Sequence, residues 1–281
     1  MQIIEESMQM QAVSLDLRTK GSGIGLVSTS GALHPGHGAL IAKARESVDT
    51  VVVSTLVNPL EFGPNEDFQR YPRTPEKDEA FCREAGVDIL FRPDAQTLFP
   101  PGFSSSVTET SVSRTLCGVS RTNYFNGVCT YHTMLLNLIR PDKLFLGQKD
   151  AQKAVVLGKF FQELHFPVEI EMVDTIREES GLACSARNTY LNDFQLRDAS
   201  ALYGALQEGK RLVDTGITNV DRVVAEVIHH ISQHRRLRVI YVSIVEPRTM
   251  QAVRAEIVTG EALIVAAIWC DEVRLIDNIL L

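Results

Sequence analysis

The feature that most constrains the fold is a nearly continuous run of β-branched residues, DTVVVSTLV, from Asp49 to Val57. A strand with one exposed face alternates apolar and polar residues, whereas this run carries apolar residues at successive positions. Strands of this kind are typical of parallel sheets that helices cover on both faces. The pattern predicts further strands at 24–27, 87–91, 141–146 and 168–173.

Helical patterns separate these strands, at about 35–47, 75–85 and 128–138. The alternation of strand and helix predicts an α/β fold, a Rossmann-like doubly wound parallel sheet. From residue 193 the order changes to two helices and then strands at 239–245 and 262–269, which predicts a smaller α+β domain. We therefore expect a Rossmann-like domain at 1–176, a flexible loop and linker at 177–188, and a C-terminal α+β domain at 189–281.

Charge and composition exclude several classes of function. The net charge of -7 provides no global basic field for nucleic acid. No apolar run reaches the roughly 18 residues that would span a bilayer, and the acidic N-terminus lacks the basic start of a signal peptide. The five cysteines include no CxxC pair, which predicts reduced thiols in a cytoplasmic protein. Among them, Cys184 is expected to pack rather than to act as a nucleophile.

Two histidines three residues apart, His34 and His37, follow the strand at 24–27 and the small residues 28–31. The segment predicts a strand, a tight turn and a helix start. The free N–H groups and the positive dipole end of such a helix attract anions, and two imidazoles add hydrogen-bond donors. Zinc is the alternative ligand, but helical zinc pairs usually lie four residues apart. The turn of small residues favours a phosphate.

Two other segments carry groups that bind phosphates. Lys149 follows Gly147 at a predicted strand-to-helix turn, and the carboxylate of Asp150 can accept from ribose hydroxyls. Further on, Ser185 and Arg187 offer a hydroxyl and a bidentate guanidinium. Together these groups suit attack of a carboxylate on the α-phosphate of ATP, with pyrophosphate leaving. Neither GxxxxGK[ST] nor GxGxxG occurs, which argues against a P-loop enzyme and a dinucleotide oxidoreductase.

These motifs resemble those of a known family. TSGALHPGH looks like the HIGH-type motif of the nucleotidyltransferase superfamily, and CSARN looks like its KMSKS-type loop. The whole chain resembles the pantothenate synthetase (pantoate–β-alanine ligase) family. The matching stretches, in order, are GALHPGH, VNPLEFGPNEDFQRYPRTPEKD, SRTNYFNGV, GQKDAQK, REESGLACSARN and RLIDN.

The resemblance implies an ATP domain, a C-terminal domain that acts as a lid, and a homodimer. It implies ATP with Mg²⁺, and a small carboxylic acid and an amine as the other substrates. The acid forms an acyl-adenylate, which the amine then attacks. By motif position, the resemblance implies that the phosphates are bound during catalysis by His34, His37, Lys149, Ser185 and Arg187. Contacts with ATP fall to Ser30, Gly31, Gly147, Asp150, Ile176 and Cys184. The acid pocket falls to Asn58, Glu61, Arg121, Tyr124 and Lys153, and the metal to Asp78.

The chain departs from the family pattern mainly in the acid pocket. Glu61 and Lys153 stand where the family has two glutamines, and Tyr124 replaces a histidine. In one interpretation Glu61 and Lys153 pair with each other, and the acid is still pantoate. In the other, Lys153 pairs with an extra acidic group, or Glu61 with an ammonium, on a different acid, because a buried unpaired charge is costly.

Other functions are compatible with the same motifs. A nucleotidyltransferase of this superfamily would release pyrophosphate and make no amide. A protein that only binds nucleotides would bind ATP without turnover, but the presence of His34, His37, Lys149 and Arg187 argues against it.

Overall fold

The computed structural model describes residues 1–281, which divide into two compact units. Unit 1 comprises Met1–Thr110, Arg121–Gly147 and Val156–Asp174. Unit 2 comprises Ser111–Ser120, Gln148–Val155 and Thr175–Leu281. The long segment of unit 2 thus begins near the predicted boundary at residue 176, and two short segments from earlier in the chain belong to the same unit.

Unit 1 is built on a six-stranded sheet in the order β1-β4-β3-β2-β5-β6. Every neighbouring pair is parallel. The predicted Rossmann-like α/β fold is therefore confirmed, and the run from Asp49 provides β3, whose residues are all buried. The strands are β1 (Gln2–Ile4), β2 (Ile24–Thr29), β3 (Thr50–Thr55), β4 (Ile89–Phe91), β5 (Lys143–Gly147) and β6 (Glu169–Val173).

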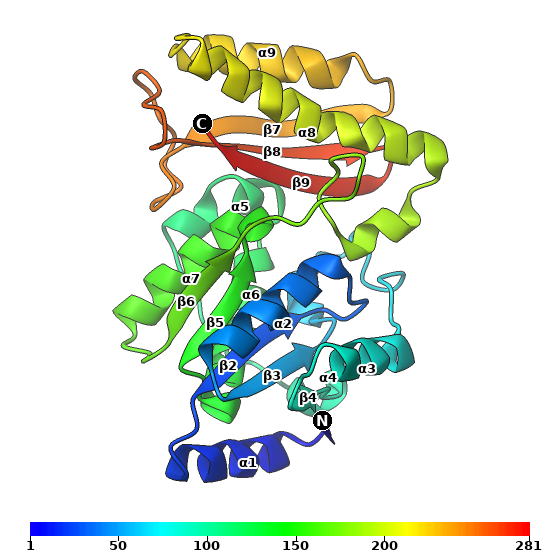
Figure 1. Ribbon diagram of the computed structural model, residues 1–281, viewed down its shortest axis with the longest axis vertical. Helices are drawn as coiled ribbons and strands as arrows, with labels where there is room; N and C mark the ends of the chain where they lie inside the picture. The colour runs from blue at the N-terminus through cyan, green and yellow to red at the C-terminus, as the bar shows by residue number, and fades with distance from the viewer. The chain divides into compact units, whose positions relative to one another are not determined.

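Helices cover both faces of this sheet (Figure 1). Val51 and Val53 of β3 share a buried cluster with residues of α2 and α3. Ser54, whose side chain points to the other face, hydrogen bonds through Oγ to the hydroxyl of Tyr131 in α6 at 2.7 Å. The helices of unit 1 are α1 (Ser7–Thr19), α2 (Pro35–Ser47), α3 (Pro75–Glu84), α4 (Ala95–Leu98), α6 (Tyr124–Ile139) and most of α7 (Ala151–Glu163).

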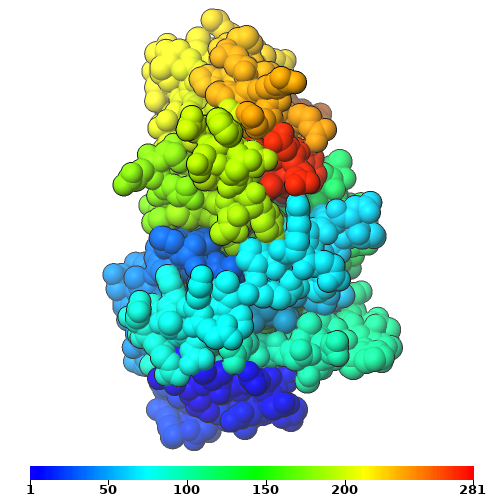
Figure 2. All heavy atoms as spheres, turned by 90° about the vertical axis from the view of Figure 1, so that its right-hand side faces the viewer, coloured from blue at the N-terminus to red at the C-terminus, as the bar shows by residue number.

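The N-terminal helix α1 lies at the surface of unit 1, in dark blue in Figure 2. Its side chains Met8 and Leu15 are exposed, and it packs on α6. No helix of the chain combines the length and the apolar character needed to cross a membrane. All five cysteines are free thiols and all are buried.

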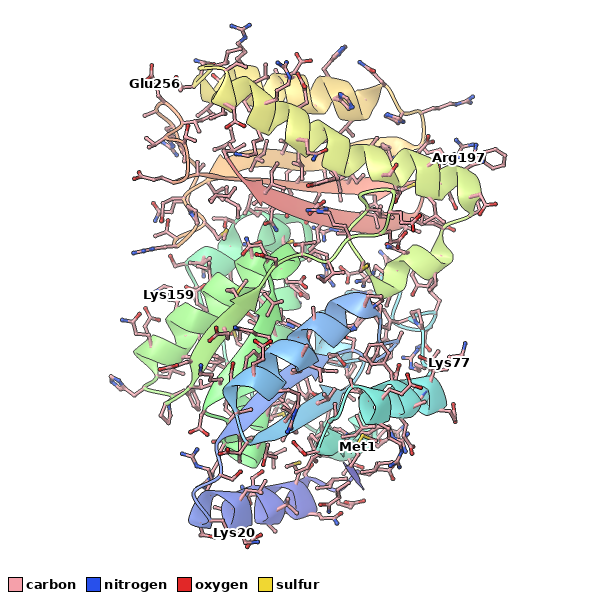
Figure 3. All side chains as sticks on the ribbon, in the orientation of Figure 1. Met1, Lys20, Lys77, Lys159, Arg197 and Glu256 are labelled. Carbon is pink, nitrogen blue, oxygen red and sulfur yellow. The ribbon has the colours of Figure 1, made fainter.

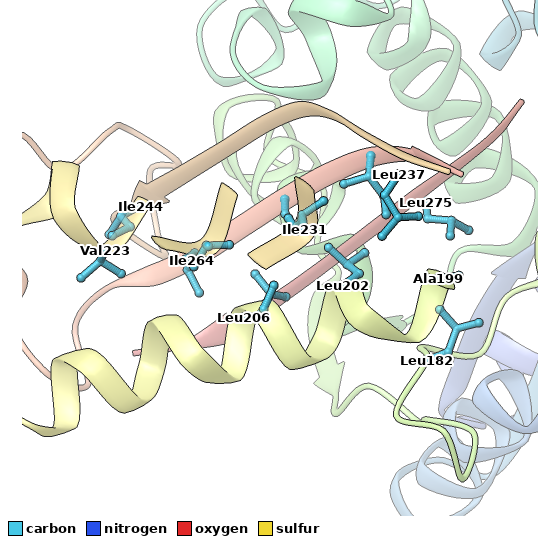
Figure 4. Close-up of a cluster of buried hydrophobic side chains, with 14 of the residues drawn as sticks. Leu182, Ala199, Leu202, Leu206, Val223, Ile231, Leu237, Ile244, Ile264 and Leu275 are labelled. Carbon is cyan, nitrogen blue, oxygen red and sulfur yellow. The ribbon is translucent and has the colours of Figure 1, made fainter. Parts of the chain in front are cut away.

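Unit 2 contains a three-stranded antiparallel sheet in the order β7-β8-β9. Two helices cover one face, and Figure 4 shows Leu202 and Leu206 of α8 pointing toward the strands that carry Ile264 and Leu275. The elements are η2 (Val112–Arg114), α5 (Cys117–Ser120), η3 (Gln148–Asp150), η4 (Ala186–Tyr190), α8 (Asp193–Asp214), α9 (Val220–Ser232), β7 (Leu237–Val245), β8 (Leu263–Cys270) and β9 (Val273–Leu280). The smaller α+β domain is confirmed, but its third strand, β9, was not predicted.

Candidate functional site

The predicted histidine turn joins β2 to α2 in unit 1. Gly31 and Ala32 both have positive φ angles, 75° and 50°, so the chain reverses sharply before His34. His34 is the N-cap of α2, and Pro35 occupies the first helical position, where no N–H is needed. The strand, turn and helix start are therefore as predicted, and the helix bounds agree with the prediction.

The two imidazoles lie together at the N-terminus of α2. Their ring centroids are 3.9 Å apart, and the backbone N–H of His34 donates to Nδ1 of His37 at 3.3 Å. A nitrogen that accepts carries no proton, so neutral His37 bears its proton on Nε2. The side chain is thus fixed as a donor through Nε2 at a helix end that attracts anions. Ser30 and Gly31, the predicted ATP contacts, form the beginning of the same turn.

Asp78, the predicted metal ligand, lies beneath this turn. Its carboxylate is buried, with 5% of the residue exposed. Oδ2 accepts from the N–H of Ala32 at 2.9 Å, and Oδ1 accepts from the N–H of Leu33 at 2.8 Å and from Oγ1 of Thr74 at 3.1 Å. Three of the roughly four lone-pair positions of a carboxylate are therefore occupied by protein donors.

The protein contains no group of side chains that could hold a metal ion by themselves. No group of three or more histidine, cysteine, aspartate or glutamate side chains is placed to hold an ion. Mg²⁺ commonly binds through substrate phosphates and waters with one or two carboxylates. Because the oxygens of Asp78 already accept from Ala32, Leu33 and Thr74, this carboxylate does not fit the role of the one that would hold the ion.

Four of the five predicted acid-pocket residues belong to unit 1, where they connect η1 (Pro59–Glu61) to α6. Asn58 is 1% exposed, and its Nδ2 donates to Oε1 of Glu61 at 2.9 Å and to the carbonyl of Gly127 at 3.1 Å. A Cβ atom on Gly127 would lie 2.2 Å from the carbonyl oxygen of Leu60. Only glycine therefore permits this approach of α6 to η1.

Arg121, another of the predicted acid-pocket residues, contacts Glu66 and the backbone of Glu61. Its guanidinium makes two hydrogen bonds to Glu66, at 2.8 and 2.6 Å, and one at 2.9 Å to the carbonyl oxygen of Glu61. The guanidinium carbon also lies 3.8 Å from the centroid of the Tyr124 ring. Within unit 1 the Glu61 carboxylate thus has one neutral partner, Asn58, while the charge of Arg121 is directed to Glu66.

The remaining predicted residues belong to unit 2, except Gly147, which ends β5. Lys149 and Asp150 lie in η3, with Nζ of Lys149 3.8 Å from Oδ2 of Asp150. Asn278 of β9 holds this turn, because its Nδ2 donates to the carbonyls of Gln148 and Lys149 at 2.9 and 3.1 Å. Lys153 follows in α7, where it is half-buried.

The segment expected to be a flexible loop is a short hairpin with many hydrogen bonds. The N–H of Cys184 donates to the carbonyl of Ile176 at 2.9 Å, and Arg177 forms a β-bridge with Ala183. Cys184 is buried, as the packing role predicts. Ser185 caps η4, with its Oγ accepting from the N–H of Arg187 at 3.2 Å.

Sequence reasoning missed the residues that support these groups. The guanidinium of Arg177 makes two hydrogen bonds to the buried Asp277, at 2.6 and 3.0 Å, and lies 3.6 Å from the ring centroid of Tyr203. Asn188 donates to Oε1 of Glu178 at 2.6 Å, across the hairpin. The matching stretch RLIDN was the available signal for Asp277 and Asn278, since two polar residues interrupt an apolar strand.

Comparison with known proteins gives consistent matches along the whole chain. The model of the family described as pantoate-beta-alanine ligase matches residues 2–280. The chain is 40% identical over 281 residues to the pantothenate synthetase of Thermotoga petrophila, covering 100% of both proteins. It is 41% identical over 272 residues to that of a Geobacillus species, covering 97% of this chain and 96% of the relative.

Solved structures agree with these matches. The pantothenate synthetase of Thermus thermophilus is 36% identical and superposes with a TM-score of 0.93, covering 100% of this chain and 99% of that one. The pantoate-beta-alanine ligase of Francisella tularensis, described as complexed with beta-gamma ATP and beta-alanine, is 29% identical. Its TM-score is 0.82, with coverage of 100% of this chain and 97% of that one.

Proposed function

Because this chain belongs to the pantoate–β-alanine ligase family, we propose that it joins pantoate to β-alanine in a reaction driven by ATP. The enzyme is an AMP-forming ligase that makes a C–N bond, and its reaction uses ATP and Mg²⁺. The acid's carboxylate attacks the α-phosphorus of ATP, and pyrophosphate leaves. The amine then attacks the acyl carbon, and AMP leaves.

The histidine turn is the observation that carries this proposal. A helix N-terminus with two adjacent imidazoles, one held with its donor on Nε2, suits the charge that develops on the phosphates. We propose the same role for Lys149, Ser185 and Arg187. Ser30, Gly31, Gly147, Asp150, Ile176 and Cys184 are proposed to contact the rest of ATP.

A substitution of Lys149 tests this assignment. Lys149→Ala is expected to abolish pyrophosphate release with little effect on the unfolding temperature, because its ion pair with Asp150 is long, 3.8 Å, and partly exposed, and such pairs contribute little to stability. Lys159→Ala is the matched control, since Lys159 lies on the outer side of α7 in Figure 3 and pairs only with Glu163. Pyrophosphate release that persists in Lys149→Ala would remove this lysine from the mechanism.

A second candidate acid is favoured by one observation. Within unit 1, Glu61 presents a half-buried carboxylate with no cationic partner, and such a carboxylate favours a substrate that carries a positive charge. We would therefore measure amide formation with β-alanine and either pantoate or a panel of small hydroxy, keto and amino acids. Turnover with pantoate supports the first candidate, and turnover only with another acid supports the second.

Assembly and location are also part of the proposal. We propose a homodimer that works in the cytoplasm and binds no nucleic acid or membrane. The family resemblance supports the dimer, and the net charge of -7 supports the absence of a nucleic-acid partner. Light scattering on the purified protein tests the dimer, and a mass of one chain, 31.2 kDa, would contradict it.

A further inference from the structure

We infer that Asp78 is a positioning residue that sets the geometry of the histidine turn, and that it is not a magnesium ligand. The inference rests on the proposed function in so far as the turn acts in catalysis. It concerns the residues of unit 1 only, and every contact that carries it lies between α3 and the turn from Gly31 to His34.

The backbone of the turn needs support from outside. Ala32 has a φ angle of 50°, a conformation that residues with a Cβ rarely adopt without help. The neighbouring N–H groups of Ala32 and Leu33 donate to the two oxygens of Asp78. One side chain thus satisfies two successive donors, and it does so immediately before His34.

Asp78 is itself fixed in place. It lies in the first turn of α3, where a negative charge is favourable at the positive end of the helix dipole. Oγ1 of Thr74 donates to Oδ1 at 3.1 Å, and the N–H of Asp78 donates to the carbonyl of Thr74 at 2.8 Å. The position of α3 therefore determines where the N–H groups of Ala32 and Leu33 are held, because both donate to the buried carboxylate of Asp78.

Protein donors already occupy most of the acceptor positions of this carboxylate. A Cβ atom on Gly31 would lie 3.0 Å from Oδ2 of Asp78, so the turn packs directly on the oxygen. Mg²⁺ would need an oxygen at about 2.0–2.1 Å with an open approach. The carboxylate instead accepts three hydrogen bonds from protein donors.

The positioning role predicts a specific kinetic change in Asp78→Asn. An amide keeps one acceptor but presents N–H atoms to a backbone donor, so one bond to the turn is lost. We expect kcat for pyrophosphate release to fall about ten- to a hundredfold, as for loss of one hydrogen bond to a charged group. The Mg²⁺ concentration that gives half-maximal activity is expected to stay unchanged.

Glu79→Gln is the matched control, because it makes the same change of charge at the next residue of α3, where the carboxylate pairs with Arg83. We would measure kcat, KM for ATP and the Mg²⁺ dependence in the wild type and both variants. A value of kcat for Asp78→Asn equal to that of Glu79→Gln would overturn the inference. So would a raised Mg²⁺ requirement with kcat restored at high Mg²⁺, which would make Asp78 a ligand.

Two further measurements keep the test independent of folding and of the substrate. If Asp78→Asn does not fold, Thr74→Val removes one donor to the same carboxylate and is expected to lower kcat severalfold at unchanged Mg²⁺ dependence. An unchanged kcat there contradicts the inference. The ring signals of His34 and His37 in NMR spectra are expected to shift in Asp78→Asn but not in Glu79→Gln. This holds even if the wild type shows no turnover, a result that would count against the proposed function alone.

Discussion

The close approach of α6 to η1 predicts the effect of Gly127→Ala. The added Cβ would lie 2.2 Å from the carbonyl oxygen of Leu60 and 2.8 Å from the amide nitrogen of Glu61. Both neighbours are backbone atoms, so no side-chain rotation relieves the clash, and the helix and η1 must separate. The hydrogen bond from Asn58 to the carbonyl of Gly127, 3.1 Å long, is then lost.

Three terms give the size of the effect. Overpacking of this kind costs about 1–3 kcal/mol, and the lost hydrogen bond costs about 1 kcal/mol. Alanine is a better helix former than glycine by about 1 kcal/mol. The free energy of unfolding is therefore expected to fall by about 1–3 kcal/mol, which lowers the unfolding temperature by roughly 2–5 °C for a chain of this length.

Gly158→Ala in α7 is the matched control, because its nearest neighbour would be Cδ1 of Ile170 at an ordinary 3.6 Å. This variant is expected to be as stable as the wild type or up to about 1 kcal/mol more stable. Calorimetry measures both variants, and kinetics should show a raised KM for the acid in Gly127→Ala only, since η1 carries Glu61. Equal unfolding temperatures for the two variants would refute the reasoning.

Three further predictions concern charge and ionisation. Arg177→Met is expected to lower the free energy of unfolding by about 3–5 kcal/mol, because the buried carboxylate of Asp277, 3% exposed, would lose its partner. Urea titrations measure this loss, and a value below about 1 kcal/mol would contradict the prediction. Burial raises the pKa of the Cys82 and Cys129 thiols from 9.0 to about 12. The unfolded chain therefore releases these protons at a lower pH than the folded chain does. The free energy of unfolding is expected to fall as pH rises from 9 towards 12. Rapid alkylation of both thiols in the native protein at about pH 9 would count against that burial. Glu61→Gln is expected to raise kcat/KM for pantoate at least severalfold, because it removes a half-buried negative charge from the pocket proposed for an anionic acid. A decrease in kcat/KM would contradict this and show that Glu61 supports pantoate binding.

The sequence was sufficient to predict the elements whose signals are local. A run with apolar residues at successive positions requires cover on both faces, and the run from Asp49 became the buried strand β3. Pro35 and the small residues before it likewise fixed the start of α2. The third strand of unit 2 was missed because Asp277 and Asn278 interrupt its apolar pattern, and their partners Arg177, Gln148 and Lys149 lie at least 100 residues away in the chain.

Roles that depend on contacts between distant segments were beyond sequence reasoning for the same reason. The motif predicted Asp78 as a metal ligand, but it gave no sign that both oxygens accept from N–H groups 45 and 46 residues earlier in the chain. The engagement of Arg121 by Glu66, which leaves Glu61 with Asn58, also follows only from the packing of η1 on α6. The roles of the individual site residues stay predictions.

The central claim is that a carboxylate attacks the α-phosphate of ATP, and isotope transfer tests it most directly. The enzyme is incubated with Mg²⁺, ATP, β-alanine and pantoate labelled with ¹⁸O in both carboxylate oxygens, and the products are analysed by mass spectrometry. The account predicts one ¹⁸O in the phosphate of AMP and none in pyrophosphate, because the attacking oxygen stays with the α-phosphorus when the amide forms. ADP with labelled inorganic phosphate, or AMP without label, would contradict the adenylate mechanism.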